Sequence, residues 1–247
     1  MLTVDYETLD LHAGDRLLDI GCGFGRHSYE ALRRGADVVA SDFALPELLE
    51  VNKTVLAMED AGELPEGVSS ASCNGDVTRL PFPDASFDRI IASEILEHID
   101  DDHGALRELV RILRPGGTLA ATVPATLPEK VCWSISDEYH APKAEGGHVR
   151  IYGRGELANR MRQAGLRVTS RHRAHALHSP YWWLRCAVGV NRDVHDNKLT
   201  SVYNRFLTWD IMKAPTVTRA ADRVLNPILG KSLVVYGTKP VEGGAER

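Results

Sequence analysis

Short apolar runs alternate with amphipathic stretches over residues 15–122, and this alternation restricts the fold more than any other feature of the chain. Apolar runs typical of strands lie at residues 16–21, 37–42, 68–76, 87–93 and 118–124. Helical periodicity fills the intervals, at residues 27–35, 45–59 and 102–113. This order predicts an α/β fold with a parallel sheet, helices on both faces and right-handed crossovers.

The rest of the chain is less regular. Residues 125–150 contain Pro, Gly and polar residues with little periodicity, which predicts a long loop beside the site. Residues 153–165 have a helical pattern, and residues 166–173 and 232–240 have the pattern of two more strands. About 58 residues separate those strands, which is too many for a turn, so we expect an insertion.

The composition indicates an ordinary globular protein. The 247 residues are 43% hydrophobic and 26% charged, which fits a single large domain. Four cysteines lie far apart without metal-ligand spacing, so we expect reduced thiols and a cytoplasmic location without a signal peptide. The net charge of -5 argues against a general nucleic-acid binder, and no apolar run approaches the roughly 18 residues of a membrane span.

The stretch LLDIGCGFGRHSYE, residues 17–30, places three glycines between an expected strand and an expected helix. Glycines allow positive φ and a close approach of a ligand to the backbone, and the helix N-terminus offers N–H donors. The spacing of Gly21, Gly23 and Gly25 differs from the G-x-G-x-x-G of dinucleotide sites. Asp19 would repel a pyrophosphate but suits a ligand with an ammonium group.

Two further acids end the next two expected strands. Asp42 is placed to accept hydrogen bonds from ribose hydroxyls, and Asp76 from an adenine amino group. Because the carboxyl ends of parallel strands meet at one edge of a sheet, Asp19, Asp42 and Asp76 are expected to converge there. The sequence therefore predicts a nucleoside site at this edge.

These motifs resemble the class I S-adenosylmethionine-dependent methyltransferases, in particular the ubiquinone/menaquinone-biosynthesis-like type 11 group. The matching stretches are LLDIGCGFG, VVASD, GDVTRLPFPDASFDRIIASEILEHIDD, ALRELVRILRPGGTLAATVP and HVRIYGRGELANRMRQAGLRV. The resemblance implies a Rossmann-like seven-stranded sheet of order 3-2-1-4-5-7-6, with strand 7 antiparallel. It implies one domain, with its core at about 12–173 and 231–240 and a helical lid at about 174–230.

The resemblance also implies S-adenosylmethionine as the cofactor and S-adenosylhomocysteine as the product. It places Asp19 and the glycine loop at the methionyl part, Asp42 at the ribose and Asp76 at the adenine. The ten residues that it assigns to the cofactor are Asp19, Gly21, Gly23, Gly25, Asp42, Phe43, Asp76, Val77, Ser93 and Glu94.

Methyl transfer is an in-line SN2 reaction, and a base is needed only if the acceptor carries a proton at neutral pH. His98 follows the fourth strand, and His140 lies in the long loop, so both are candidate catalytic bases. The alternatives are a histidine bonded to backbone for His98 and a solvated loop residue for His140. The resemblance implies that His148 and Arg150 orient the loop over the cofactor.

The expected lid is basic and aromatic. Residues 171–231 hold ten Lys/Arg and four Asp/Glu, and three of the four tryptophans. The aromatic side chains either pack the lid against the sheet, or line an acceptor pocket and contact an anionic membrane surface. We expect this segment to set the choice of acceptor. The candidate substrate residues are Tyr139, His148, Arg150, Tyr181, Trp182 and Trp183.

The leading hypothesis is a small-molecule methyltransferase acting on oxygen or carbon, with a lipid-, quinone- or glycolipid-like acceptor. A non-catalytic S-adenosylmethionine-binding protein and a nicotinamide-dependent oxidoreductase are the alternatives, and the glycine spacing with Asp19 argues against the second. No metal site is expected, because His172, His175 and His178 would alternate faces on a strand. No nucleic-acid partner is expected, and the oligomeric state is left open.

Overall fold

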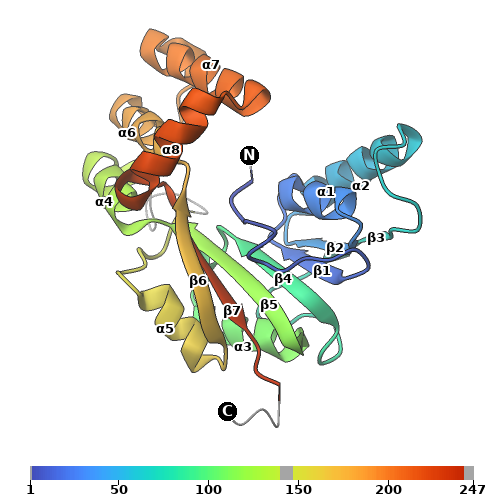
Figure 1. Cartoon of the computed structure of the whole chain (residues 1–247). Helices are drawn as coiled ribbons and strands as arrows, with labels where there is room; N and C mark the ends of the chain where they lie inside the picture. Colours follow the sequence, from blue (N-terminus) through green and yellow to red (C-terminus); the bar gives the residue numbers. More distant parts are fainter. Residues whose placement is uncertain (1, 140–146, 242–247) are drawn as a thin grey trace.

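The computed structural model describes residues 2–139 and 147–241, and a seven-stranded sheet forms its centre (Figure 1). The strand order is β3-β2-β1-β4-β5-β7-β6, and β7 runs antiparallel to both of its neighbours. The strands are β1 (Arg16–Ile20), β2 (Asp37–Asp42), β3 (Ser70–Asn74), β4 (Phe87–Ser93), β5 (Leu113–Pro124), β6 (Arg167–Ala174) and β7 (Ser232–Thr238). The expected fold class is confirmed, including the antiparallel seventh strand.

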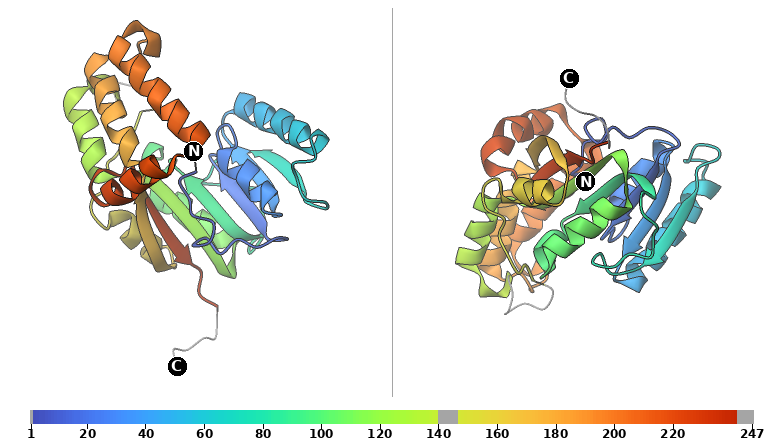
Figure 2. Two further views of the ribbon diagram at one scale, coloured as in Figure 1. Left: turned by 45° about the horizontal axis from the view of Figure 1, so that its top comes forward. Right: turned by 90° about the horizontal axis from the view of Figure 1, so that it is seen from below.

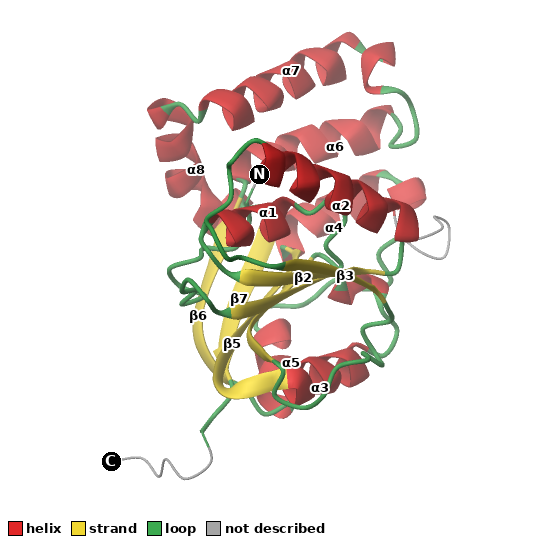
Figure 3. Ribbon diagram, turned by 90° about the vertical axis from the view of Figure 1, so that its right-hand side faces the viewer, coloured by secondary structure: helices red, strands yellow, loops and turns green. Residues whose placement is uncertain are grey.

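Helices cover both faces of the sheet, and α4, α6, α7 and α8 gather beyond the end of β5 (Figures 1, 2 and 3). The helices of the described residues are α1 (Arg26–Arg33), α2 (Leu45–Asp60), α3 (Asp102–Ile112), α4 (Thr126–Ile135), α5 (Glu156–Gln163), α6 (Ser179–Val188), α7 (Lys198–Lys213) and α8 (Thr216–Leu229). The short 3₁₀ turns are η1 (Leu96–His98), η2 (Asp137–Tyr139), η3 (Ala176–His178) and η4 (Val194–Asp196). No helix in the described ranges is long and apolar enough to cross a membrane.

Alternating side chains of the strands build two hydrophobic layers, as the period of two in a strand requires. On one face, Leu18 and Ile90 pack with Leu109 of α3. On the other face, Leu17 packs with the side chains of α1 and α2 and with residues 4–9 of the N-terminal segment. Each fully buried aliphatic side chain contributes about 1.5–3 kcal/mol to the free energy of unfolding. The two layers therefore hold the sheet edge that carries the site in a fixed position.

The expected loop at residues 125–150 is wrong for its first half, where α4 and η2 lie. Helix α4 carries β-branched and aromatic residues, which favour a helix only weakly. Its stability comes from contacts with α6: the buried Pro128 accepts a hydrogen bond at its carbonyl from Trp183 Nε1, at 3.1 Å. Strand β5 also begins earlier than expected, because Gly116 N bonds to Lys239 O at 2.8 Å.

Candidate active site

The glycine loop between β1 and α1 has the tight geometry that its sequence indicates. Gly21 has φ of 66°, and a Cβ there would collide with Ile95, so only glycine fits. Gly25 has φ of 78° and begins α1, and a Cβ would lie 2.7 Å from the Tyr29 ring. Gly25 lines neither of the two cavities beside the loop. Its role in the structure is therefore the turn into α1.

Asp19 lies at the end of β1 with only 1% of its surface exposed. Its Oδ2 accepts a hydrogen bond from Ser28 Oγ at 2.7 Å, while its Oδ1 is buried without a partner in the described chain. Burial raises the pKa of this carboxyl to about 6. It lines a small cavity of about 270 Å³ with Gly21 and Gly23. An unpaired buried carboxylate oxygen in a cavity is what an ammonium group would satisfy.

A larger cavity of about 930 Å³ lies along the carboxyl ends of β1 to β4. We call it the cofactor cavity. Asp42 accepts from Gly23 N and Ala44 N, both at 2.9 Å, which fixes its carboxylate at the rim and leaves lone pairs for a ribose. Phe43 is 84% exposed there, and a ligand ring would cover it.

The other residues expected at the cofactor line the same two cavities, with Gly25 the exception. Asp76 and Val77 line the cofactor cavity after β3. Ser93 lines the smaller cavity beside Asp19, and its Oγ accepts from Arg26 Nη2 at 2.9 Å. Glu94 lines the cofactor cavity from the end of β4. These cavities thus bring together every expected cofactor residue except Gly25.

A third cavity of about 460 Å³, the acceptor cavity, shares Glu94 and His98 with the cofactor cavity. Aromatic and apolar side chains from η2, α6 and α7 form part of its wall, and the ring centroids of Tyr139 and Trp182 lie 5.8 Å apart. Its other lining residues include Thr3, Arg26, Glu97, His148, His175, His178, Ile211, Lys231 and Ser232. It therefore lies between the cofactor cavity and residues 174–230.

A buried charged network stands behind the acceptor cavity. Glu129 of α4 is fully buried, and its Oε1 accepts hydrogen bonds from His148 Nδ1 and from Trp133 Nε1 at 2.8 Å. Its Oε2 pairs with Lys231 Nζ at 3.2 Å, and Lys231 also donates to Tyr139 Oη at 3.1 Å. Burial opposes ionisation of Glu129, but His148 and Lys231 together hold its pKa below the ordinary value.

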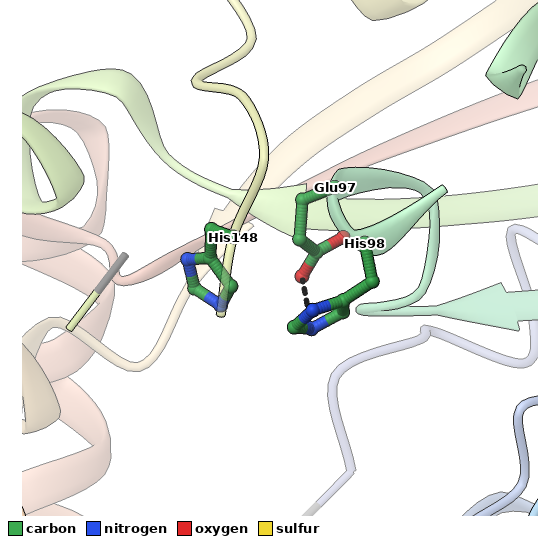
Figure 4. A group of neighbouring side chains, drawn as sticks. All are labelled: Glu97, His98 and His148. Atoms are coloured by element: carbon green, nitrogen blue, oxygen red, sulfur yellow. Dashed lines mark ion pairs between the residues drawn. The ribbon is translucent and has the colours of Figure 1, made fainter. Parts of the chain in front are cut away.

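Glu97, His98 and His148 face one another in the acceptor cavity (Figure 4). One ligand-type atom from each lies within 4.8 Å of the others. Among the described residues, neither carboxylate oxygen of the buried Glu97 has a hydrogen-bond partner, and burial, with the charge of Glu94, raises its pKa well above the ordinary value. The loop that carries His148 is tied to this group, because Val149 N donates to Glu97 O at 2.9 Å. This arrangement can hold a proton or a divalent cation.

The candidate substrate residues divide into two sets. Tyr139, His148 and Trp182 line the acceptor cavity. The other three have structural partners elsewhere: Tyr181 packs on Tyr203, Trp183 bonds to Pro128, and Arg150 pairs with Asp102 at 2.7 Å. His140, the second candidate base, lies outside the described residues.

The structure also brings in residues that sequence reasoning did not select. Arg26 follows the glycine loop directly, and Glu97 precedes His98, so both had a positional signal. Glu129 and Lys231 had none, because they come from a segment expected to be a loop and from the start of β7. In the RHRAHALH stretch, His172 and His175 have hydrogen-bond contacts, such as His175 Nε2 with Thr3 Oγ1 at 3.1 Å, while His178 Nδ1 is buried without a hydrogen-bond partner among the described residues.

Residues 18–121 match a family model described as a methyltransferase domain. The 27-O-demethylrifamycin SV methyltransferase of Amycolatopsis mediterranei is 31% identical over 70% of this chain and 62% of its own length. Residues 18–121 therefore form a methyltransferase domain. The ubiquinone biosynthesis O-methyltransferase of Xanthomonas axonopodis is 34% identical over 63% of this chain and 64% of its own length.

Solved structures support the fold of this methyltransferase. A SAM-dependent methyltransferase from Methanosarcina mazei superposes with a TM-score of 0.62 at 15% identity, covering 98% of this chain and all of that one. The chain spans less than two thirds of the length of the first curated relatives that it matches, 62%, 40% and 44%. S-adenosylmethionine is the cofactor of this family, and the unpaired Asp19 oxygen and the Asp42 rim fit its ammonium and ribose groups.

Replacing Asp42 by alanine is expected to weaken S-adenosylhomocysteine binding roughly 10- to 100-fold, since about 1.5–3 kcal/mol of charged hydrogen bonding is lost. Isothermal titration calorimetry measures this change. Asp37→Ala is the matched control, because Asp37 also accepts from a backbone amide, Ser69 N at 2.7 Å, at the opposite end of β2. An unchanged affinity in Asp42→Ala would remove the ribose assignment.

Cofactor affinity is expected to fall as the pH drops through about 6, the pKa of Asp19. The ammonium group binds the ionised carboxylate, which predominates above this pKa and is lost below it. Titrations of S-adenosylhomocysteine between about pH 5 and about pH 8 test this dependence. The Asp19→Asn variant is the control, with weak affinity throughout, and a wild type equally insensitive to pH would contradict the assignment.

Proposed function

We propose that the protein transfers the methyl group of S-adenosylmethionine to a hydroxyl group of a small hydrophobic acceptor. The observation that carries this proposal is the Glu129–His148 pair at the acceptor cavity, which adjoins the cofactor cavity. A histidine oriented by a buried carboxylate is a common form of general base. An alcohol or phenol acceptor needs a base to remove its proton, whereas an acceptor that is already ionised does not.

The residues of the chain divide the work between them. S-adenosylmethionine supplies an electrophilic methyl group when bound. Glu129 accepts the Nδ1–H of His148, which leaves Nε2 with a lone pair for the hydroxyl proton of the acceptor. Glu129 stabilises the imidazolium that results, and Lys231 keeps Glu129 ionised. His148 would take the hydroxyl proton as the acceptor oxygen is methylated, and the transfer balances because the sulfonium would become a neutral thioether.

The walls of the acceptor cavity favour a lipid-, quinone- or glycolipid-like molecule. The residues 174–230 supply Trp182 of α6 and Ile211 of α7, and η2 supplies Tyr139. Aromatic side chains bury large flat ligands at low entropic cost. The named relatives include methyltransferases of a rifamycin and of ubiquinone biosynthesis, which agrees with this class. Oxygen rather than carbon is favoured because a base faces the cavity.

The outer face of α7 fits an anionic membrane surface. Val202, Trp209 and Met212 are exposed on this face together with Lys198 and Arg205. The only acid of α7, Asp210, is buried and bonded to Arg219. Apolar side chains among basic ones, without an exposed acid, are typical of helices that lie on anionic lipid. We propose this contact as the route by which a lipid-soluble acceptor arrives.

The test is a transfer assay with methyl-labelled S-adenosylmethionine and a hydrophobic extract, followed by mass spectrometry of the labelled product. A product labelled on oxygen supports the proposal. Binding of S-adenosylmethionine without transfer to any acceptor fraction favours the non-catalytic alternative. A carbon-labelled product that forms at the same rate in His148→Gln contradicts the proposed base.

A further inference from the structure

A fourth cavity, of about 480 Å³, lies on the face of the sheet that carries α5, between the start of α5 and the second half of α8. Its lining shares no residue with the cofactor and acceptor cavities. Four arginines line this cavity and no Asp or Glu does: Arg154, Arg171, Arg173 and Arg223. We call it the arginine cavity. A concave surface with charge of one sign raises the local concentration of the opposite ion.

The register of β6 against β7 places two of the arginines over an apolar floor. Arg171 pairs with Val235, and Arg173 pairs with Leu233. Side chains of directly paired residues lie on the same face of a sheet. Leu233 and Val235 belong to the hydrophobic layer under α5, so both arginines lie over this layer, and both line the cavity.

One arginine has a structural partner, and the other three do not. Arg173 Nη1 donates to Pro227 O at 3.0 Å and Ile228 O at 3.3 Å, the last carbonyls of α8. This contact neutralises the negative end of the α8 dipole. Within residues 2–139 and 147–241, Arg154, Arg171 and Arg223 make no ion pair or hydrogen bond. Their charges therefore remain available to a ligand.

Neutral donors add to the arginines. Asn226 Oδ1 accepts from Ala176 N at 2.9 Å, so the amide N–H groups of this side chain are left for the cavity. Gly155, which begins α5, lines the cavity and brings the positive end of that helix to it. The neighbouring acid does not compete, because Glu156 is held by Gly153 N at 2.8 Å and by Arg160.

We propose that the arginine cavity is a second ligand site, which binds a phosphoryl-type anion through Arg154, Arg171 and Arg223. Guanidinium groups bind phosphate oxygens in pairs of parallel hydrogen bonds, and several of them around one concavity suit a multiply charged group. The phosphate of a soluble metabolite and the headgroup of an anionic lipid share this chemistry. Val224 and Ile228 are 75% and 63% exposed on α8 beside the cavity, where lipid chains would lie.

Calorimetric titration of the full chain with inorganic pyrophosphate tests the site. We expect pyrophosphate to bind with an affinity that falls as salt is added. Arg171→Gln and Arg223→Gln are each expected to lower this affinity roughly 10-fold or more. Arg167→Gln is the matched control, because Arg167 is exposed on the same strand and does not line the cavity. S-adenosylhomocysteine binding is expected to be unchanged in all three variants, which shows that they are folded and that the cofactor site is separate.

Vesicles of phosphatidylcholine with and without phosphatidylglycerol distinguish the two sources of phosphate. The site is assigned to a lipid headgroup if the protein sediments with the anionic vesicles, if Arg171→Gln and Arg223→Gln weaken this sedimentation, and if pyrophosphate does not bind. Pyrophosphate binding without vesicle binding assigns it to a soluble phosphate compound. The proposal is overturned if the protein binds neither probe, or if Arg167→Gln weakens binding as much as the cavity variants do.

Discussion

Replacing His148 by glutamine is expected to lower kcat for methyl transfer roughly 10²- to 10⁴-fold, the usual contribution of a general base. The Kd of S-adenosylhomocysteine is expected to stay unchanged, because His148 lines the acceptor cavity and not the cofactor cavity. Single-turnover transfer to the identified acceptor measures the first quantity, and calorimetry measures the second. Added imidazole is expected to restore part of the activity of His148→Ala.

His195→Gln is the control for this series, since His195 is exposed on η4 and bonded only to its own segment. Two outcomes would contradict the role of His148 as a base. One is an unchanged kcat in His148→Gln. The other is a wild-type activity that a chelator abolishes and a divalent cation restores, because Glu97, His98 and His148 would then act as metal ligands.

Breaking the buried Glu129–Lys231 pair is expected to cost about 3–5 kcal/mol of unfolding free energy in either single variant, Glu129→Met or Lys231→Met. The side chains are 1% and 10% exposed, so Glu129→Met leaves the Lys231 charge without its carboxylate partner in a medium of low polarity, and Lys231→Met leaves Glu129 with only His148 and Trp133 as partners among the described residues. The double variant is expected to recover much of this loss, because two apolar side chains then replace the pair. Urea unfolding of the four proteins measures the coupling.

The surface pair Glu50–Lys53 on α2 gives the matched control. Its side chains are 55% and 68% exposed, so Lys53→Met is expected to cost less than about 1 kcal/mol. If the buried single variants cost no more than this surface variant, the network does not stabilise the wall of the acceptor cavity. Glu129→Met is also expected to reduce kcat, because His148 loses the group that orients it.

Much of the sheet could be predicted because its strands have strong local signals. The stretch FDRIIAS is buried throughout its apolar part and forms β4 over the expected residues. Three acids that follow separate strands meet at one edge, because parallel strands end there together. The sheet order came from the family resemblance, since no local pattern states which strands are neighbours.

Helix α4 could not be predicted, because it depends on a partner more than 50 residues away. Trp183 on α6 reaches the carbonyl of Pro128, and Cys132 is buried between the helices. Intrinsic propensity is a weak guide when tertiary packing decides. The local sequence of α4 therefore indicates a loop, because the helix forms only when it packs on α6.

Most residues that line the cofactor cavity could be selected from the sequence, whereas the buried network behind the acceptor cavity could not. Asp19 and Asp42 lie in the last two residues of β1 and β2, and Asp76 lies just after β3, so the topology brings them to one edge of the sheet. Glu129, His148 and Lys231 come from a helix, a loop and a strand start, and no spacing in the chain relates them. The sequence indicated His148 as a residue of the loop, but it did not indicate Glu129, the carboxylate that orients the His148 imidazole.

Glu94 belongs to the walls of both the cofactor cavity and the acceptor cavity, and its backbone has φ of 57°, which is rare for any residue but glycine. Thr122 holds it there, since Glu94 N donates to Thr122 O at 3.0 Å and Thr122 Oγ1 donates to Glu94 Oε1 at 2.8 Å. A ligand that displaces this side chain from one cavity changes the wall of the other. Thermodynamic linkage then requires reciprocity: whatever factor the cofactor applies to acceptor affinity, the acceptor applies to cofactor affinity.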